Sequence, residues 1–130
     1  DDSVEPGKVK RLVLCSGKIG HELFTAREEA ERDDVAICRV EQLYPFPKDQ
    51  LLTQIGRYPN LEHVIWTQEE PRNMGAWSFV LQRFHDLGRP LRYAGRAESA
   101  SPATGSYSRH SAEQAFLIKM AFGEPERAES

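Results

Sequence analysis

Short, continuous apolar runs alternate along the chain with longer stretches in which apolar residues recur every three or four positions. The apolar runs predict strands at residues 10–16, 35–40, 62–67 and 91–94. The periodic stretches predict helices at residues 19–32, 48–57, 76–87 and about 110–122. Four strands that alternate with four helices are typical of a mostly parallel sheet covered on both faces. We therefore expect a three-layer α/β/α fold.

The apolar stripe of each predicted helix should pack against this sheet. In the third helix the stripe consists of Trp77, Val80, Leu81, Phe84 and Leu87. In the last helix the stripe is built on Ala112, Ala115, Phe116 and Met120. These side chains are the predicted contacts between the two helices and the sheet.

The two ends of the chain differ from the middle. The chain opens with Asp1 rather than Met, and its first eight residues are mostly polar. We interpret residues 1–8 as a linker from upstream domains and residues 9–123 as one α/β domain. The charged segment 124–130 lacks apolar anchors, so we expect it to fray.

Composition and charge exclude several classes of function. The 130 residues carry 17 basic and 20 acidic side chains, a net charge of -3, which gives no electrostatic basis for binding nucleic acid or an anionic membrane. No apolar run approaches the roughly 20 residues that span a bilayer, and no signal peptide opens the chain. Cys15 and Cys38 lie in apolar runs, so we expect two buried thiols in a reducing compartment rather than a disulfide.

The most informative segment is QEEPRNMGAW, residues 68–77. It follows a predicted strand and precedes a predicted helix, the place where open α/β sheets keep their sites. Glu69 and Glu70 put two carboxylates at the strand end, Pro71 should stop the strand, and Gly75 lets the backbone turn into the helix. The segment predicts a docking site, and its residues leave open whether a ligand or another subunit docks there.

A second candidate is the turn Ser16, Gly17 and Lys18, between the first strand and the first helix. Backbone N–H groups at a helix start favour anions, and Lys18 would add positive charge. The spaced glycines of a phosphate loop or dinucleotide fingerprint are missing, so a tight connecting turn explains the glycine equally well. His21, just beyond, is interpreted as a partly exposed helix residue rather than a catalytic base.

The segment VEQLYPFP, residues 40–47, places Glu41 and Gln42 after the second strand. An acid–base pair of Glu41 with Glu69 or Glu70 is conceivable across the sheet. No nucleophile accompanies such a pair, and the four histidines have no close ligand spacing. A hydrolase or a metal site is therefore the less favoured hypothesis.

The segment RYAGRAESASPATG, residues 92–105, is the third candidate. We interpret Arg92 and Arg96 as flanking a strand end, and the loop behind them contains Ser99 and Ser101 among other small residues. Because nothing bulky projects from such a loop, it could lie flat against a partner surface or an anion. The alternative is a flexible surface loop.

Five segments together carry a family resemblance: LCSGK, DVAICRVEQLYPFP, QEEPRNMGAW, RYAGR, and SASPATG with the later His110 and Gln114. In this order they resemble the C-terminal domain of the thiamine-dependent first component of the 2-oxoglutarate dehydrogenase complex. The resemblance covers roughly residues 9–123. Met74 departs from the pattern, since many members have Gln there.

The resemblance implies a large homodimeric enzyme that decarboxylates 2-oxoglutarate and transfers the succinyl group to lipoyl-lysine. Its partners would be the dihydrolipoyl succinyltransferase core and dihydrolipoyl dehydrogenase. Thiamine diphosphate and Mg²⁺ would bind to upstream domains, and none is expected in this chain. The bacterial cytoplasm or the mitochondrial matrix would be the compartment. The fold would resemble the C-terminal domain of transketolases, typically with five strands of which one is antiparallel, so a short edge strand would be hidden here.

The resemblance carries no thiamine or magnesium motif onto this chain, so no catalytic residue is assigned. We expect polar contacts with neighbouring domains or the second subunit from two groups of residues: Glu69, Glu70, Arg72 and Asn73, and Arg92, Arg96, Ser99 and Ser101. Ser16, Gly17 and Lys18 form the predicted anion-facing turn, and in some family members this domain borders an allosteric site. The alternative is a stand-alone domain that binds a nucleotide or an acyl-coenzyme.

Overall fold

The computed structural model describes residues 3–96 and 107–123, with side chains from residue 111 onward in the second segment. The strands are β1 (Arg11–Cys15), β2 (Val35–Arg39), β3 (His63–Pro71) and β4 (Arg92–Arg96). The helices are the 3-10 turn η1 (Pro6–Lys8), α1 (Ile19–Glu29), α2 (Lys48–Gly56), α3 (Trp77–Asp86) and α4 (Tyr107–Phe122). All predicted elements are present, and β3 extends four residues past its predicted end.

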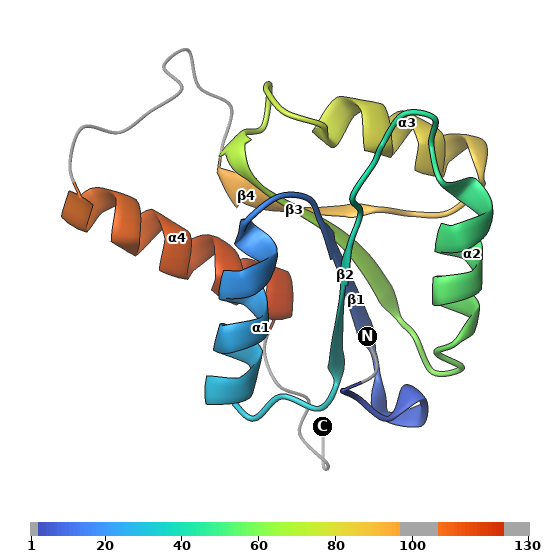
Figure 1. Cartoon of the computed structure of the whole chain (residues 1–130), viewed down its shortest axis with the longest axis horizontal. Coiled ribbons are helices and arrows are strands. Elements are labelled where there is room, and N and C mark those ends of the chain that lie inside the picture. Colours follow the sequence, from blue (N-terminus) through green and yellow to red (C-terminus); the bar gives the residue numbers. More distant parts are fainter. Residues whose placement is uncertain (1–2, 97–106, 124–130) are drawn as a thin grey trace.

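The four strands form one parallel sheet in the order β2-β1-β3-β4 (Figure 1). No antiparallel fifth strand occurs within residues 3–96 and 107–123, so the expected hidden strand is not in this part of the chain. The central strand β1 has apolar residues at four consecutive positions and buries all of them. A strand covered on both faces requires such a continuous run.

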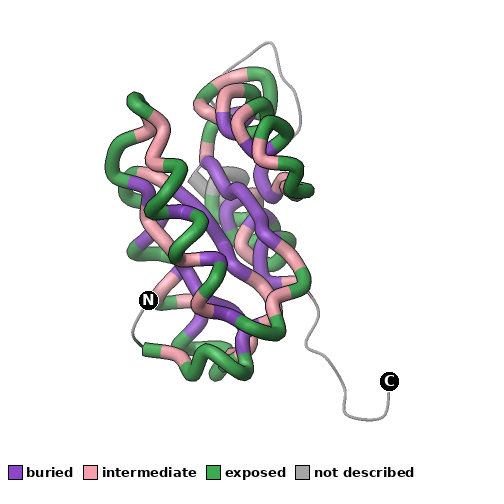
Figure 2. Tube along the Cα trace, turned by 90° about the vertical axis from the view of Figure 1, so that its right-hand side faces the viewer, coloured by how far each residue is buried: buried purple, intermediate pink, exposed green. Residues whose placement is uncertain are grey.

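Helices cover both faces of the sheet, which confirms the three-layer α/β/α prediction. Alternate residues of β1 enter two separate cores: Leu12 and Leu14 pack with α2 and α3, and Val13 and Cys15 pack with α1 and α4. Burial is concentrated along the strands, and exposed residues line the outer sides of the helices (Figure 2). At about 25 cal/mol per Å² of buried apolar area, these two cores supply the main driving force for folding.

The predicted apolar face of the last helix is wrong. Ala112, Ala115, Phe116 and Met120 are all exposed, and the Phe116 side chain retains 64% of its accessible surface. From residue 111 onward, the buried positions of α4 are instead Gln114, Leu117, Ala121 and Phe122. The helix carries apolar residues on two sides, so periodicity alone could not tell which side faces the sheet. Leu81 of α3, which we predicted to be buried, is likewise 40% exposed.

Two arginines fix the end of α4 on the sheet. Arg32 donates hydrogen bonds to the carbonyl oxygens of Phe122 and Gly123, each at 2.9 Å, and to both carboxylate oxygens of Asp34. Arg11 Nε donates to the Ala121 carbonyl at 3.1 Å. These bonds satisfy carbonyls that a helix end leaves without partners. In the position that these bonds hold, α4 buries Leu117 and Ala121 and exposes Phe116.

The segment before the first strand lies against the domain. Val4 packs on the core beneath α2 and α3, and Arg27 donates a hydrogen bond to the Ser3 hydroxyl. Residues 3–8, which we predicted to be a linker, thus make contacts within the domain. The predicted tail at 124–130 lies outside the described residues.

Candidate functional site

The carboxyl ends of the parallel strands meet at one edge of the sheet, which we call the carboxyl edge. It consists of the β1–α1 turn at 16–18, the β2–α2 loop at 40–47, the end of β3 with the β3–α3 loop at 68–76, and Arg96 at the end of β4. Binding sites of open α/β folds lie at this edge, where neighbouring connections run to opposite faces. Here β1 and β3 are such neighbours, since α1 and α3 cover opposite faces.

A β-bulge shapes the β3 end of this edge. Gln68 pairs with Gly95, but the next pair is Pro71 with Arg96, so β3 uses three steps where β4 uses one. The two extra residues are Glu69 and Glu70. Bulges of this kind re-aim side chains beside functional sites. The strand ends at Pro71, as we predicted, and it includes the two glutamates that we expected at its end.

The Gln68 side chain holds the loop that follows the bulge. Its Oε1 accepts hydrogen bonds from Trp66 Nε1 at 2.9 Å and from the Trp77 backbone N–H at 3.0 Å. Its Nε2 donates to the carbonyls of Met74 at 2.7 Å and Pro71 at 3.0 Å. Gln68 is 4% exposed, and sequence reasoning had not singled it out. The sequence signal that could have identified Gln68 is an amide side chain placed just after an apolar run.

Gly75 is required in this loop for two reasons. Its φ of +68° lies in the left-handed region, which side chains other than glycine rarely adopt. A Cβ atom there would also lie 3.1 Å from Gln68 Oε1. The loop therefore closes tightly around the Gln68 amide. Glu70, Arg72 and Asn73 remain exposed on its outer surface, and Glu69 is partly exposed.

The β1–α1 turn has the geometry of a compact connection. Gly17 has a φ of +77°, and Gly17 and Lys18 are exposed while Ser16 is partly buried. Arg39 of β2 crosses the first turn of α1. The approach is so close that a Cβ atom on Gly20 would lie only 2.6 Å from Arg39 Cδ. Arg39 Nε is 3.7 Å from Glu41 Oε1. A guanidinium and a carboxylate thus lie together beside the predicted anion-facing turn.

Glu41 therefore pairs with Arg39 rather than with a second carboxylate. Glu41 follows β2 and Glu69 lies in β3, with β1 between them. Two strand spacings of about 4.8 Å separate their backbones by roughly 10 Å. This arrangement provides no close acid–base pair of Glu41 and Glu69.

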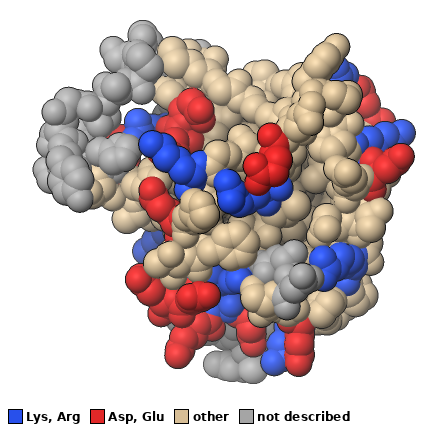
Figure 3. Space-filling model, in the orientation of Figure 1, with Lys and Arg blue, Asp and Glu red and all other residues tan. Residues whose placement is uncertain are grey.

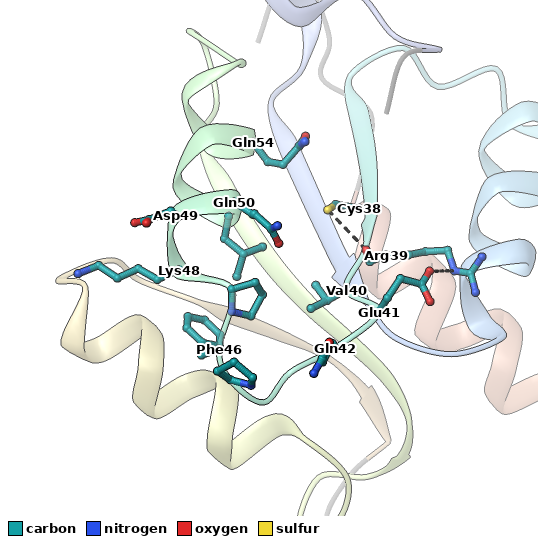
Figure 4. Close-up of a pocket in the computed structure, with 13 residues that line it drawn as sticks. Cys38, Arg39, Val40, Glu41, Gln42, Phe46, Lys48, Asp49, Gln50 and Gln54 are labelled. Atoms are coloured by element: carbon teal, nitrogen blue, oxygen red, sulfur yellow. Dashed lines mark hydrogen bonds and ion pairs between the residues drawn. The ribbon is translucent and has the colours of Figure 1, made fainter.

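A pocket of about 830 Å³ lies between the end of β2 and the first turns of α2 (Figure 4). Its walls mix apolar Val40, Phe46 and Leu51 with charged and amide side chains from both elements. The Cys38 thiol faces it and lies 3.9 Å from the Arg39 carbonyl oxygen. Burial raises the pKa of Cys38, so the thiol stays protonated near neutral pH and is a weak nucleophile.

Both cysteines are free thiols, as predicted, but Cys15 is buried whereas Cys38 is partly exposed. Cys15 points into the core shared with α1 and α4, and Cys38 points to the other face of the sheet. Burial, followed by the neighbouring Cys38, raises the pKa of Cys15 to about 12. Neither thiol has the depressed pKa that nucleophilic cysteines need.

Arg92 and Arg96 lie at opposite ends of β4, so the prediction that they flank one strand end is wrong. Arg96 is at the carboxyl edge, where its Nε lies 3.3 Å from Glu113 Oε2 of α4. Arg92 is at the amino-terminal end of β4, near Arg11. The pKa of Arg11 is lowered by burial and then by the positive charges of Arg92 and Arg32. Ser99 and Ser101 lie outside the described residues.

Charges of both signs are interspersed on the face shown in Figure 3, without a large patch of one sign among the coloured residues. Within the described part of the chain, no three His, Cys, Asp or Glu side chains are placed to share a metal ion. Within these described residues, every helix is too short or too polar to cross a membrane.

The fold first places the chain in a structural class, the three-layer α/β/α folds that include a solved transketolase chain. The solved structure described as a split gene transketolase, inactive beta4 tetramer, matches with a TM-score of 0.62 over 93% of this chain and 43% of that chain. At 17% sequence identity, this likeness shows the fold alone. The predicted fold class is confirmed.

The family described as 2-oxoglutarate dehydrogenase C-terminal matches residues 1–122, so the chain belongs to this family. The chain is 43% identical over 125 residues to the 2-oxoglutarate dehydrogenase E1 component of Cupriavidus necator, and 46% identical over 127 residues to that of Azotobacter vinelandii. It covers only 13% and 14% of these relatives, while 93% of this chain is matched in each. The predicted family is confirmed.

Proposed function

We propose that the chain acts as the C-terminal domain of an E1 enzyme that decarboxylates 2-oxoglutarate and transfers the succinyl group to lipoyl-lysine. The observation that carries this proposal is the family match over residues 1–122, together with the names of relatives that are 43–46% identical. In such an enzyme the bound thiamine diphosphate supplies the carbanion chemistry. Residues outside this chain would hold thiamine diphosphate and Mg²⁺.

The role of this domain would be assembly rather than chemistry. Two exposed surfaces support this proposal: the charged β3–α3 loop at the carboxyl edge, and the apolar outer face of α4 with Phe116 and Met120. Monomeric proteins rarely leave large apolar side chains clustered in water, and such clusters mark interaction sites. The dihydrolipoyl succinyltransferase core and dihydrolipoyl dehydrogenase would be partners of the whole enzyme. The relatives named above are bacterial, which supports the bacterial cytoplasm as the compartment.

The test compares this chain with the full polypeptide that contains it. The natural polypeptide should have an intact mass several times the 14.8 kDa of this chain. The full polypeptide with thiamine diphosphate and Mg²⁺ should release CO₂ from 2-oxoglutarate, and this chain alone should release none. A natural polypeptide of about 14.8 kDa, or decarboxylation by this chain alone, would contradict the proposal.

The alternative function is the binding of an acyl-coenzyme or nucleotide effector at the turn of Ser16, Gly17 and Lys18. The exposed Lys18 and the nearby Arg39 favour an anion there, while the Glu41 carboxylate beside Arg39 opposes it. Calorimetric titration with acetyl-coenzyme A and with AMP tests this alternative. Heat of binding that disappears in Lys18→Ala but persists in Lys48→Ala would support a site at the turn.

A further inference from the structure

Arg72 lies on the outer surface of the β3–α3 loop and stacks on two aromatic rings. Its Cζ is 5.7 Å from the ring centroid of Trp77 and 5.1 Å from that of Tyr93. These distances are within the range of cation–π attraction. The residue nevertheless remains exposed. The two rings thus support the guanidinium without enclosing it.

Both rings are themselves fixed. Trp77 is 6% exposed, and its backbone N–H donates to Gln68 Oε1. The Tyr93 hydroxyl donates to the Arg96 carbonyl, and the two ring centroids are 5.0 Å apart. A side chain that is already ordered loses less conformational entropy when it binds. Arg72 is therefore prepared for a contact in a way that an unsupported surface arginine is not.

The other stacked arginines differ from Arg72 in one respect. Each has a polar partner: Arg27 the Val35 carbonyl, Arg57 the Gln54 amide oxygen, and Arg83 the Asp86 carboxylate. Over the described ranges, Arg72 forms no ion pair or side-chain hydrogen bond. Its donors therefore face solvent although its position is fixed.

We propose that the Arg72 guanidinium binds a carboxylate of another domain of the same polypeptide. The planar fork of arginine pairs with a carboxylate through two parallel hydrogen bonds. Glu69 and Glu70 lie within three residues of Arg72, so the local charge is -1, which favours a partner that carries basic residues beside its carboxylate over a polyphosphate, which carries negative charge alone. A protein surface with an acidic residue for Arg72 and basic residues for the two glutamates matches this pattern.

This inference rests on the proposed function and names the partner of one surface. The chain covers 13% of the Cupriavidus necator relative, so most of such an E1 chain is available to contact the loop. Contacts between domains of one chain are more polar than obligate subunit interfaces. The loop is charged, whereas the outer face of α4 is apolar. A tethered partner also needs only a weak contact, because the linkage gives it a high effective concentration.

The experiment labels arginines with phenylglyoxal in the full-length dimeric enzyme and follows each site by mass spectrometry. We expect Arg72 to react at least about tenfold more slowly than Arg83, a ratio that corresponds to about 1.4 kcal/mol of docking. The protection should persist in samples diluted until the dimer dissociates. It should largely disappear in 1 M salt, since an ion pair near the surface is screened.

Variants provide a second measurement by amide hydrogen exchange of residues 72–76 in the full-length enzyme. Arg72→Met should raise exchange several-fold, and Arg72→Lys should raise it less because the charge remains. Arg83→Met is the matched control, because Arg83 also stacks on a ring, at 4.8 Å from the Phe79 centroid, and it should leave exchange unchanged. Equal effects of Arg72→Met and Arg83→Met would contradict the proposal.

Three labelling results would overturn it. Equal reactivity of Arg72 and Arg83 would show that no partner covers the loop. Protection that is lost on dilution would identify the second subunit instead of the same chain. Protection that survives 1 M salt would indicate apolar burial instead of a carboxylate. If Phe116→Ser dissociates the dimer while Arg72 reacts freely, the assembly role stands and this inference fails.

Discussion

At the scale of single residues, the Gln68 side chain shapes the candidate site because it bonds to both ends of the loop. It joins Trp66 of β3, the Trp77 backbone at the start of α3, and two carbonyls between them. A buried amide of this kind is valuable only when all of its hydrogen bonds are made, since unmatched buried groups are costly. The exposed Arg72 and the two bulged glutamates depend on this buried amide for their positions.

Gln68→Leu should destabilise the chain by about 3 kcal/mol, because the Trp66 indole N–H and the Met74 carbonyl lose their buried partner. The measurement is urea unfolding of the 130-residue chain. Gln82→Leu is the control, since Gln82 is exposed and donates a surface hydrogen bond to Asp86. It should change the free energy of unfolding by less than about 0.5 kcal/mol. Similar losses in both variants would refute the organising role of Gln68.

Two glycine substitutions should have opposite effects on stability. Gly75→Ala should destabilise by at least about 1 kcal/mol, since its φ is positive and the new methyl group would crowd Gln68. Gly56→Ala should stabilise by up to about 1 kcal/mol, because Gly56 is helical and no atom lies within 4 Å of its added Cβ. Thermal unfolding followed by circular dichroism measures both. A stabilised Gly75→Ala would contradict the described loop.

At the scale of elements, the end of α4 depends on the turn between α1 and β2. Arg32 is 9% exposed at its side chain and bonds to Asp34 and to the last carbonyls of α4. Burial by itself would raise the pKa of Asp34, but the hydrogen bond and charge of Arg32 act against it, and the net pKa is lowered. The charged carboxylate is therefore stabilised in the folded state.

A lowered pKa of Asp34 makes stability depend on pH in a defined direction. The stabilising contribution of the Asp34 carboxylate is present above the ordinary aspartate pKa of about 4. It is lost as the pH falls through the lower pKa that Asp34 has in the folded state. Unfolding free energies measured between pH 6 and pH 2 should therefore fall more steeply for the wild type than for Asp34→Asn. Asp33→Asn is the neighbouring control, because Asp33 is 72% exposed and pairs with exposed Lys8 at 3.6 Å. It should keep the wild-type slope.

At the scale of the whole molecule, the three-layer arrangement could be predicted from the sequence, because parallel strands that are buried on both faces consist of continuous apolar residues. The rotation of α4 could not be predicted, since the helix has two apolar sides and the side chains that hold its end, Arg11 and Arg32, lie far away in sequence. The segments 16–18, 40–47 and 68–76 lie at the carboxyl edge, as strand ends of a parallel sheet should, and the contacts expected of their residues remain predictions. The support of Arg72 depends on Tyr93 of another strand, which no local pattern reveals.

The exposed side of α4 leads to a prediction about the assembled enzyme. Phe116→Ser should leave the stability of this chain within about 0.5 kcal/mol of the wild type, because the side chain is 64% exposed. In the full-length enzyme it should weaken the dimer at least about tenfold, since apolar anchors carry most interface energy. Leu81→Ser is the matched control, a 40% exposed apolar side chain on α3. Sedimentation measures the dissociation constants, and equal values for both variants would remove the α4 face from the interface.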